Sequence, residues 1–215
     1  AAHNGNINAI SLLLKAGAKV NAQDDEGDPP LQWALSENHL QSVKLLITAG
    51  AKIDVKNRDG RAALYWAQTA ESLQFLINAG ADVNSGDNYG YTPLQNAATD
   101  GDIERIKILI KAGADVNRSN EYGGTPLINA VKKQSEEGMN ILIKAGAMVN
   151  IKGDFGNTPL MTATIGQWKA GVITLLKAGA DINAINESGN TPLGLAISHG
   201  YPEMADLLRS LGARN

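Results

Sequence analysis

Residues 87–119 read DNYGYTPLQNAATDGDIERIKILIKAGADVNRS, and this stretch of 33 residues decides the fold. Its first four residues are a turn signal, because Asp and Asn form local hydrogen bonds and Gly accepts a positive φ. Thr92 is a suitable N-cap, and Pro93 suits the first helical position, where its missing N–H costs nothing. The sequence therefore predicts a short first helix over residues 94–99.

A second helix is expected directly after this one. Gly101 ends the first helix, and the apolar residues that follow Asp102 have a spacing of three and four, which places them on one helix face. These residues are Ile103, Ile106, Leu109 and Ile110. Gly113 is the expected C′ residue that closes the second helix. Because two short helices cannot bury an apolar stripe alone, we expect each pair to stack on neighbouring pairs.

The same pattern recurs along the whole chain. A Gly-Ala pair after an apolar run marks each repeat, with a spacing of 33 residues except for one interval of 30. Its glycines are Gly17, Gly50, Gly80, Gly113, Gly146, Gly179 and Gly212. The sequence predicts a single domain over residues 1–215. Its repeats are expected at 1–23 (partial, without the opening of the motif), 24–56, 57–86 (shortened), 87–119, 120–152, 153–185 and 186–215.

Composition limits the class of protein. The chain is 43% hydrophobic and 19% charged, and it has no apolar run long enough to cross a bilayer, so we expect a soluble globular protein without membrane insertion. Its 19 Lys and Arg against 22 Asp and Glu give a net charge of −3, which provides no broad cationic field. Nucleic acid is therefore not expected as a partner. The absence of Cys excludes disulfides, thiolate nucleophiles and zinc–thiolate sites.

The motif resembles the ankyrin repeat. The residues that carry the resemblance are Thr92-Pro93-Leu94, Ala97-Ala98, Gly101 and residues 111–117 (KAGADVN), and the repeats extend it over the entire chain. The resemblance implies an all-α solenoid of helix-turn-helix units joined by β-hairpin loops. It also implies a concave surface, lined by first helices and hairpin tips, that binds other proteins without catalysis. We therefore expect a monomer that needs no cofactor.

The chain departs from the family pattern at one position. The family usually places His after Thr-Pro-Leu, where it ties neighbouring repeats by hydrogen bonds, but no repeat of this chain has His there. The position holds Gln32, Tyr65, Gln95, Ile128, Met161 and Gly194. We interpret the departure as drift, since repeat cores tolerate apolar substitution.

Two other irregularities concern backbone support. The repeat at 57–86 lacks three residues and has Ala62-Ala63 in place of Thr-Pro, so a shortened first helix or inter-helix turn is expected, with a loss of about 1 kcal/mol of local support. We expect this repeat to be the weakest of the array or a bend in it.

Gly138 and Gly171 share one position inside second helices. Either a neighbour packs closely there or these helices are loose, and looseness is the simpler expectation.

Catalytic and metal chemistry finds little support in the sequence. His3, His39 and His199 fall in inter-helix turns of different repeats, so we do not expect them to converge on a metal ion or a nucleophile. The acidic residues at 24–28 suggest a calcium loop, but Leu35 stands where the closing Glu belongs. Residues 122–125 (YGGT) lack the Lys of a phosphate-binding loop.

Aromatic residues are the best candidates for a binding site. Tyr89, Tyr122 and Phe155 share the third position of their repeats, at the expected hairpin tip, beside Tyr91. Trp33 and Trp66 share a position on the first helix, on a face with polar neighbours. Large aromatic rings on a solvent-facing surface are typical of protein interfaces, although the rings could instead pack on adjacent repeats. The candidate partner-binding residues are Trp33, Tyr65, Trp66, Tyr89, Tyr91, Tyr122 and Phe155.

The sequence leaves three functional hypotheses. The first is a non-catalytic scaffold that binds one folded partner protein. The second is an inhibitor or immunity-type protein that occludes the active site of a partner enzyme. The third, with least support, is an enzyme with an unrecognised site. The compartment stays open between the cytoplasm and, if a signal peptide has been removed before Ala1, the periplasm or the exterior. Frequent Asn and a preference for Lys over Arg are compatible with a bacterial source.

Overall fold

The structure is a computed structural model that describes residues 1–214, and all regular secondary structure within that range is helical. It divides into an N-terminal unit, Ala1–Pro93 with Lys111–Ala114, and a C-terminal unit, Leu94–Ile110 with Asp115–Asn215. The all-α prediction is confirmed.

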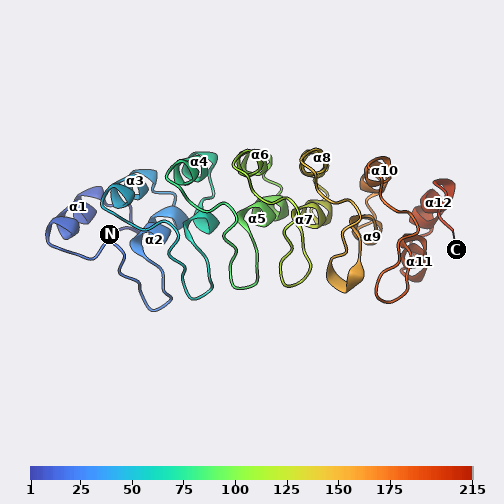
Figure 1. Cartoon of the computed structure of the whole chain (residues 1–215), viewed down its shortest axis with the longest axis horizontal. Helices are drawn as coiled ribbons and strands as arrows, with labels where there is room; N and C mark the ends of the chain where they lie inside the picture. The colour runs from blue at the N-terminus through green and yellow to red at the C-terminus, as the bar shows by residue number, and fades with distance from the viewer. Residues whose placement is uncertain (215) are drawn as a thin grey trace. The chain divides into compact units, whose positions relative to one another are not determined.

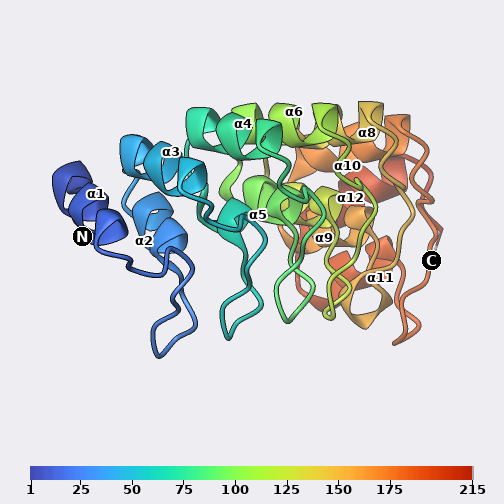
Figure 2. The same ribbon diagram turned by 60° about the vertical axis from the view of Figure 1, so that its left-hand side comes forward.

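The helices of the N-terminal unit lie in two layers (Figures 1 and 2). Helices α3 and α4 form the layer of second helices, whereas α2 and the 3₁₀ helix η1 form the layer of first helices. Helix α1 contacts α3, and α2 contacts both α3 and η1. The bounds are α1 Ile7–Lys15, α2 Pro30–Ser36, α3 Leu40–Thr48, η1 Ala63–Trp66 and α4 Ala70–Asn78.

The C-terminal unit repeats the same arrangement. Helix α9 contacts α7 and α11 in the layer of first helices, and α7, α9 and α11 each contact the second helix that follows in the chain. The hairpin loops extend from the first helices on the side away from the second helices (Figure 1). The bounds are α5 Pro93–Asp100, α6 Ile103–Lys111, α7 Pro126–Lys132, α8 Glu136–Lys144, η2 Asp154–Gly156, α9 Pro159–Ile165, α10 Lys169–Lys177, α11 Pro192–Ser198 and α12 Pro202–Ser210.

The Thr-Pro pair starts the first helices, as the sequence predicts. In α7 the Thr125 hydroxyl accepts a hydrogen bond from the Ile128 N–H at 3.3 Å, and Thr158 and Thr191 cap α9 and α11 in the same way. Proline fills the first helical position of all three helices. The caps satisfy N–H groups that have no partner inside the helix, so they fix where the helices begin.

The core lies between the two helix layers. Leu127 of α7 and Leu160 of α9 are fully buried against second helices, which contribute Met139, Leu142 and Val172. These residues follow the spacing of three and four that the sequence analysis uses. The apolar stripe therefore faces inward, whereas the hairpin-tip residues Tyr89, Tyr122 and Phe155 are exposed to solvent.

Glutamine replaces the expected histidine tie in two repeats, so the interpretation of this position as drift is wrong for both. Gln32 Nε2 donates to the carbonyl oxygens of Val55 and Arg61, at 2.9 Å each. Gln95 Nε2 donates to the oxygens of the corresponding residues of the next hairpin, Arg118 at 2.6 Å and Gly124 at 2.9 Å. Both side chains are buried, so they tie successive repeats through the backbone.

The shortened repeat loses its first α-helix and keeps its second. Residues Ala63–Trp66 form a 3₁₀ helix of four residues, and Ala62 supplies no side-chain cap. Helix α4 nevertheless has nine residues, as α3 does, because Thr69 and Ser72 form a capping box at its start. The three missing residues therefore shorten the first helix and not the inter-helix turn, which is one of the two outcomes predicted from the sequence.

The two helix-internal glycines are sites of close packing, and the expectation that these helices are loose is wrong. A Cβ atom on Gly171 would lie 2.1 Å from Cε3 of the Trp168 ring. A Cβ on Gly138 would lie 2.8 Å from the Ser135 hydroxyl oxygen, which caps α8. In both helices the glycine makes room for the side chain of the residue at the helix start. This close contact explains why glycine, which has a low helix propensity, stands inside these helices.

The histidines of the first two repeats are neighbours in the stacked inter-helix turns. His39 Nε2 lies 3.0 Å from the carbonyl oxygen of His3, and His3 Nδ1 lies 3.6 Å from a carboxylate oxygen of Glu37. The inter-helix turns of successive repeats stack, so residues 36 positions apart come together. Within residues 1–214, no group of three His, Cys, Asp or Glu side chains is arranged to hold a metal ion.

Candidate protein-binding surface

Five of the hairpin tips are closed by hydrogen bonds to the side chain of their first residue. The Asp87 carboxylate accepts hydrogen bonds from the backbone N–H groups of Tyr89 at 3.0 Å and Tyr91 at 2.9 Å. Asp24, Asn57, Asn120 and Asn186 make the equivalent pair of bonds in their hairpins. Because the turn is closed internally, the third residue projects into solvent. Tyr89 is 50% exposed and Tyr122 is 54% exposed.

The hairpin at 153–157 is the exception. Gly153 has no side chain to accept these bonds, and Phe155 adopts a φ of 55°, in the left-handed region that a bulky residue rarely occupies. The turn closes through backbone bonds alone, among them Gly153 N–H to the Asn157 oxygen at 2.9 Å. Phe155 is 68% exposed, more than either tyrosine tip. The Phe155 ring therefore stands on a turn that lacks the side-chain hydrogen bonds of the other hairpins.

An aromatic and cationic cluster occupies the shortened repeat. The rings of Tyr65 and Trp66 meet edge to face, with centroids 5.2 Å apart. The Arg61 guanidinium lies 4.4 Å from the Tyr65 ring centroid and pairs with the Asp59 carboxylate at 3.0 Å. Arg61 Nε is buried and has no hydrogen-bond partner within residues 1–214. We call Tyr65, Trp66, Arg61 and Asp59 the third-repeat cluster.

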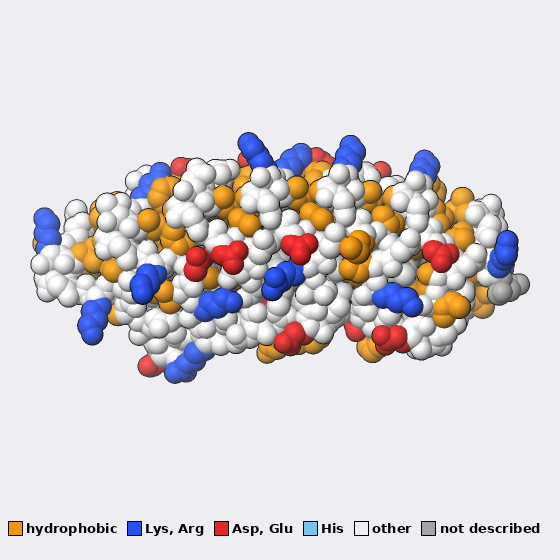
Figure 3. Space-filling view, viewed as in Figure 1, with side chains coloured by type: hydrophobic (Ala, Val, Ile, Leu, Met, Phe, Trp, Pro, Cys, Tyr) orange, Lys and Arg blue, Asp and Glu red, His pale blue; other side chains and the backbone are white. Residues whose placement is uncertain are grey.

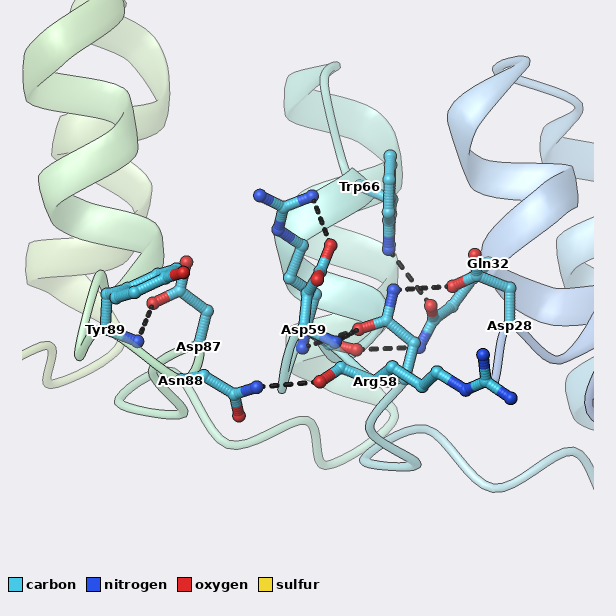
Figure 4. A network of polar contacts seen from close by, with 10 residues as sticks. Asp28, Gln32, Arg58, Asp59, Trp66, Asp87, Asn88 and Tyr89 are labelled. Carbon is cyan, nitrogen blue, oxygen red and sulfur yellow. Dashed lines mark hydrogen bonds and ion pairs between the residues drawn. The ribbon is translucent and has the colours of Figure 1, made fainter. Parts of the chain in front are cut away.

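Amide side chains connect this cluster to the preceding repeat. Trp66 Nε1 donates to Gln32 Oε1 at 3.1 Å, so the amide that ties the second hairpin backbone also orients the indole. The next hairpin is tied in turn, since Asn88 Nδ2 donates to the Arg58 carbonyl oxygen at 2.7 Å. Figure 4 shows Trp66 and Tyr89 on opposite sides of Asp59. The two rings thus border one polar network within the N-terminal unit.

Trp33 is oriented by an acidic hairpin tip. It is 37% exposed, its Nε1 donates to the Asp24 carboxylate at 2.6 Å, and the His3 ring meets it edge to face at 5.3 Å. Desolvation is the largest single influence on the pKa of Asp24, and it acts to raise that pKa. The indole donor and the N–H groups of residues 26–28 favour the carboxylate, and together they lower the pKa of Asp24 below its ordinary value.

The predicted binding residues fall into two groups. Trp33, Tyr89, Tyr122 and Phe155 are exposed, whereas Tyr65, Trp66 and Tyr91 are half-buried. Five of the seven lie in the N-terminal unit, and Tyr122 and Phe155 lie in the C-terminal unit. The structure brings Tyr65 and Trp66 into direct contact. Trp66 combines the two alternatives for these rings. It is partly open to solvent, and its indole N–H donates to Gln32 of the neighbouring repeat.

Sequence reasoning missed the polar residues that hold these rings in place. Gln32 and Gln95 occupy the same position of their repeats, and that recurrence of one amide was the signal for the tie they form. Arg61 follows a hairpin glycine directly, as Tyr91 does, and nothing in the pattern indicates that its guanidinium stacks on Tyr65. Such contacts depend on side-chain direction and not on spacing.

The charged side chains show no segregation on the face drawn in Figure 3, where acidic and basic groups are interspersed. Basic side chains project along the edge where the second helices lie, and α8 and α10 each end in a lysine. In the part of the chain that the structure describes, no helix is long and apolar enough to cross a membrane.

Comparison with known proteins identifies the family. The family model for ankyrin repeats, in three copies, matches residues 1–87, 68–153 and 145–215. No curated protein matches the chain. Ankyrin repeats are generally protein–protein interaction modules and are typically non-catalytic. Since the three matches cover the whole chain and its helix pairs recur with the Thr-Pro-Leu and Gly-Ala markers, the chain belongs to the ankyrin-repeat family.

Proposed function

We propose that the chain is a non-catalytic scaffold that binds a folded partner protein through first helices and hairpin tips, with Trp66 and Tyr89 near the centre of the contact. The observation that carries the proposal is the third-repeat cluster, in which large rings are held in fixed positions and remain partly open to solvent. Family membership supports the general role, because ankyrin repeats bind other proteins.

Fixed aromatic rings are favourable for binding because their conformational entropy is lost on folding and is not lost again on association. Trp66 is fixed by its bond to Gln32, and the backbone that carries Tyr89 is fixed by Asp87. Trp, Tyr and Arg are also the residues most enriched among interface hot spots. The cluster thus offers all three types within one short segment.

Arg61 adds polarity to this surface. Its Nη1 is paired with Asp59, and its Nε is buried without a partner within residues 1–214. A guanidinium carries five N–H donors and Asp59 is paired with Nη1 alone, so the exposed part of the group offers further donors to a carbonyl or carboxylate of the partner. We therefore expect an acceptor on the partner beside its apolar contact with Trp66.

The test is affinity capture with matched variants. The immobilised chain is incubated with a lysate of the source organism, and proteins retained by the wild type are compared with those retained by the Trp66→Ala, Tyr89→Ala double variant. The partner identified by this difference is then titrated calorimetrically. Each single substitution should weaken binding by about 2 kcal/mol or more.

Lys111→Ala is the control, because Lys111 is exposed at the end of α6, a second helix. It should change the binding free energy by less than about 0.5 kcal/mol. A partner that binds the folded double variant as tightly as the wild type would refute the proposed site. An assay of the captured partner then separates an inhibitor from an adaptor, since only an inhibitor abolishes the partner's activity on binding.

A further inference from the structure

An apolar groove of about 440 Å³ opens beside α1 in the N-terminal unit. Its walls come from α1, α2 and α3, which contribute the apolar side chains Ile10, Leu13, Leu14, Pro30, Trp33 and Leu46. Of the seven residues predicted from the sequence to bind a partner, Trp33 alone lines this groove. We call it the α1–α2 groove.

Leu13, on the α1 wall, is exposed at a position that belongs to the core in every later repeat. All seven repeats have leucine there, four residues before the glycine of the Gly-Ala marker. Leu13 is 52% exposed, whereas the six later leucines are at most 2% exposed, namely Leu46, Leu76, Leu109, Leu142, Leu175 and Leu208. The exposure of Leu13 therefore depends on its surroundings and not on its residue type.

In the later repeats the neighbour that buries this leucine is a first helix. Helices α3, α8, α10 and α12 each contact the first helix that precedes them in the chain. Helix α1 is a second helix by its register and contacts α3, and within residues 1–214 no first helix precedes it. The α1–α2 groove thus lies where the later repeats place a first helix.

Trp33, on the α2 wall, occupies a position that contacts the preceding first helix in later repeats. Trp66 Nε1 donates to Gln32 of α2 at 3.1 Å. Asn129 Nδ2 likewise donates to the Gln95 carbonyl oxygen of α5 at 3.3 Å. Trp33 makes its hydrogen bond within its own repeat, and its ring lines the groove. Both walls of the groove therefore match surfaces that contact a first helix elsewhere in the chain.

These matches indicate an α-helix as the occupant. The first helices α2, α5 and α7 have seven or eight residues, which corresponds to about 10–12 Å. In α7 the apolar residues Leu127, Ala130 and Val131 are buried, with a spacing of three and four. A helix with the same spacing would cover Leu13 as the first helices cover the equivalent leucines.

We propose that the α1–α2 groove binds an amphipathic α-helix of a partner protein, whose apolar face packs on Leu13 and Trp33. Helices of this kind commonly bind by laying their apolar face into a hydrophobic groove. Trp33 follows Gln32, which orients Trp66, so the groove and the third-repeat cluster adjoin within the N-terminal unit. The inference rests on the proposed function in that the helix belongs to a protein partner, and it extends the contact to the first repeat.

The experiment uses the full chain with ¹³C-labelled leucine methyl groups and a blocked peptide with the sequence of residues 124–134 (GTPLINAVKKQ), which contains α7. Millimolar peptide is needed, because a short helix must be ordered on binding. Titration should shift the Leu13 methyl signals and the Trp33 indole signal along a saturable curve. The signals of Leu211, an exposed leucine of the C-terminal unit, should stay in place. A peptide with Asp in place of Leu127 should not bind.

Matched leucine variants test the site, with the Trp33 indole signal as the readout. Leu13→Gln should weaken peptide binding about tenfold or more, since it removes a buried apolar contact. Leu12→Gln should leave the affinity unchanged, because Leu12 is exposed on the same helix and does not line the groove. Circular dichroism checks that both variants fold. Equal affinity of the two variants would refute the role of Leu13, and unshifted signals up to the limit of peptide solubility would refute the groove itself.

Three further arms separate this proposal from its alternatives. Nuclear Overhauser effects between successive amide protons of the bound peptide should show a helix, and an extended bound peptide would contradict the proposal. If residues 124–129 joined directly to Ala1 bury Leu13 while the free peptide does not bind, the occupant is a segment of the same polypeptide and the partner helix is wrong. The Trp66→Ala, Tyr89→Ala double variant should bind the peptide as the wild type does, since neither residue lines the groove. Failure of the proposed function is therefore measured independently of failure at the groove.

Discussion

The strongest test of the repeat tie is the replacement of Gln95 by Met, which keeps the side-chain length and removes the amide. Gln95 is 0% exposed and donates hydrogen bonds to Arg118 O and Gly124 O. Each bond contributes about 1 kcal/mol net, so the two together account for about 2 kcal/mol. The Arg118 oxygen then has no other donor within residues 1–214, which adds to the cost. We expect Gln95→Met to lower the free energy of unfolding by about 2–3 kcal/mol.

Urea denaturation followed by circular dichroism measures this change, and hydrogen exchange of the hairpin amides at 118–124 locates it. Ile128→Met is the control at the same repeat position, where no hydrogen bond is lost, and it should cost less than about 1.5 kcal/mol. Gln95→His should retain part of the tie through a ring N–H donor. If Gln95→Met unfolds within about 0.5 kcal/mol of the wild type, the two carbonyl groups are solvated without cost and the reasoning fails.

Three other predictions follow from local contacts. Gly171→Ala should destabilise the chain by more than about 1 kcal/mol in the same urea assay despite the better helix propensity of Ala, because the new methyl group meets the Trp168 ring, and the added Trp168→Ala should relieve that clash. In an NMR titration the pKa of Asp24 should lie below its ordinary value, and it should rise in Trp33→Phe because the indole donor is lost. A carboxyl group whose pKa is lower in the folded than in the unfolded state stabilises the folded protein at pH values above the unfolded pKa. This contribution to stability should therefore be lost as the pH falls through the folded pKa. Backbone amides of η1 should exchange faster than those of α2, and equal protection would contradict the view that the shortened repeat is the weakest.

The repeat pattern was sufficient to predict the helices because their determinants are local. A Thr cap, Pro at the first helical position and Gly at the end act within a few residues, so they can be recognised without knowledge of the neighbours. Helix α5 begins at Pro93 and α6 ends at Lys111, close to the bounds expected from residues 87–119. The same reasoning placed Tyr89 and Tyr122 at exposed hairpin tips, since the turn chemistry of the first residue is also local.

Contacts between repeats could not be predicted in this way. Gln95 reaches residues 23 and 29 positions ahead, His39 reaches back 36 positions, and Trp168 covers Gly171 through the direction of its ring. The intrinsic preference of each residue type gives no information on such contacts. By that preference alone the Gln substitutions are interpreted as drift and the glycine as a sign of a loose helix.

The sequence by itself determined the family, the helix pairs and the exposed tips, because short-range hydrogen bonding and apolar periodicity are present in every repeat. Only the tertiary structure decided which departures from the pattern make contacts between repeats. Gln32 orients Trp66, and Ile128 packs beside Gly153, because residues of successive repeats are brought within contact distance. Each of these effects depends on two residues that are close in space, so it cannot be predicted from either residue alone.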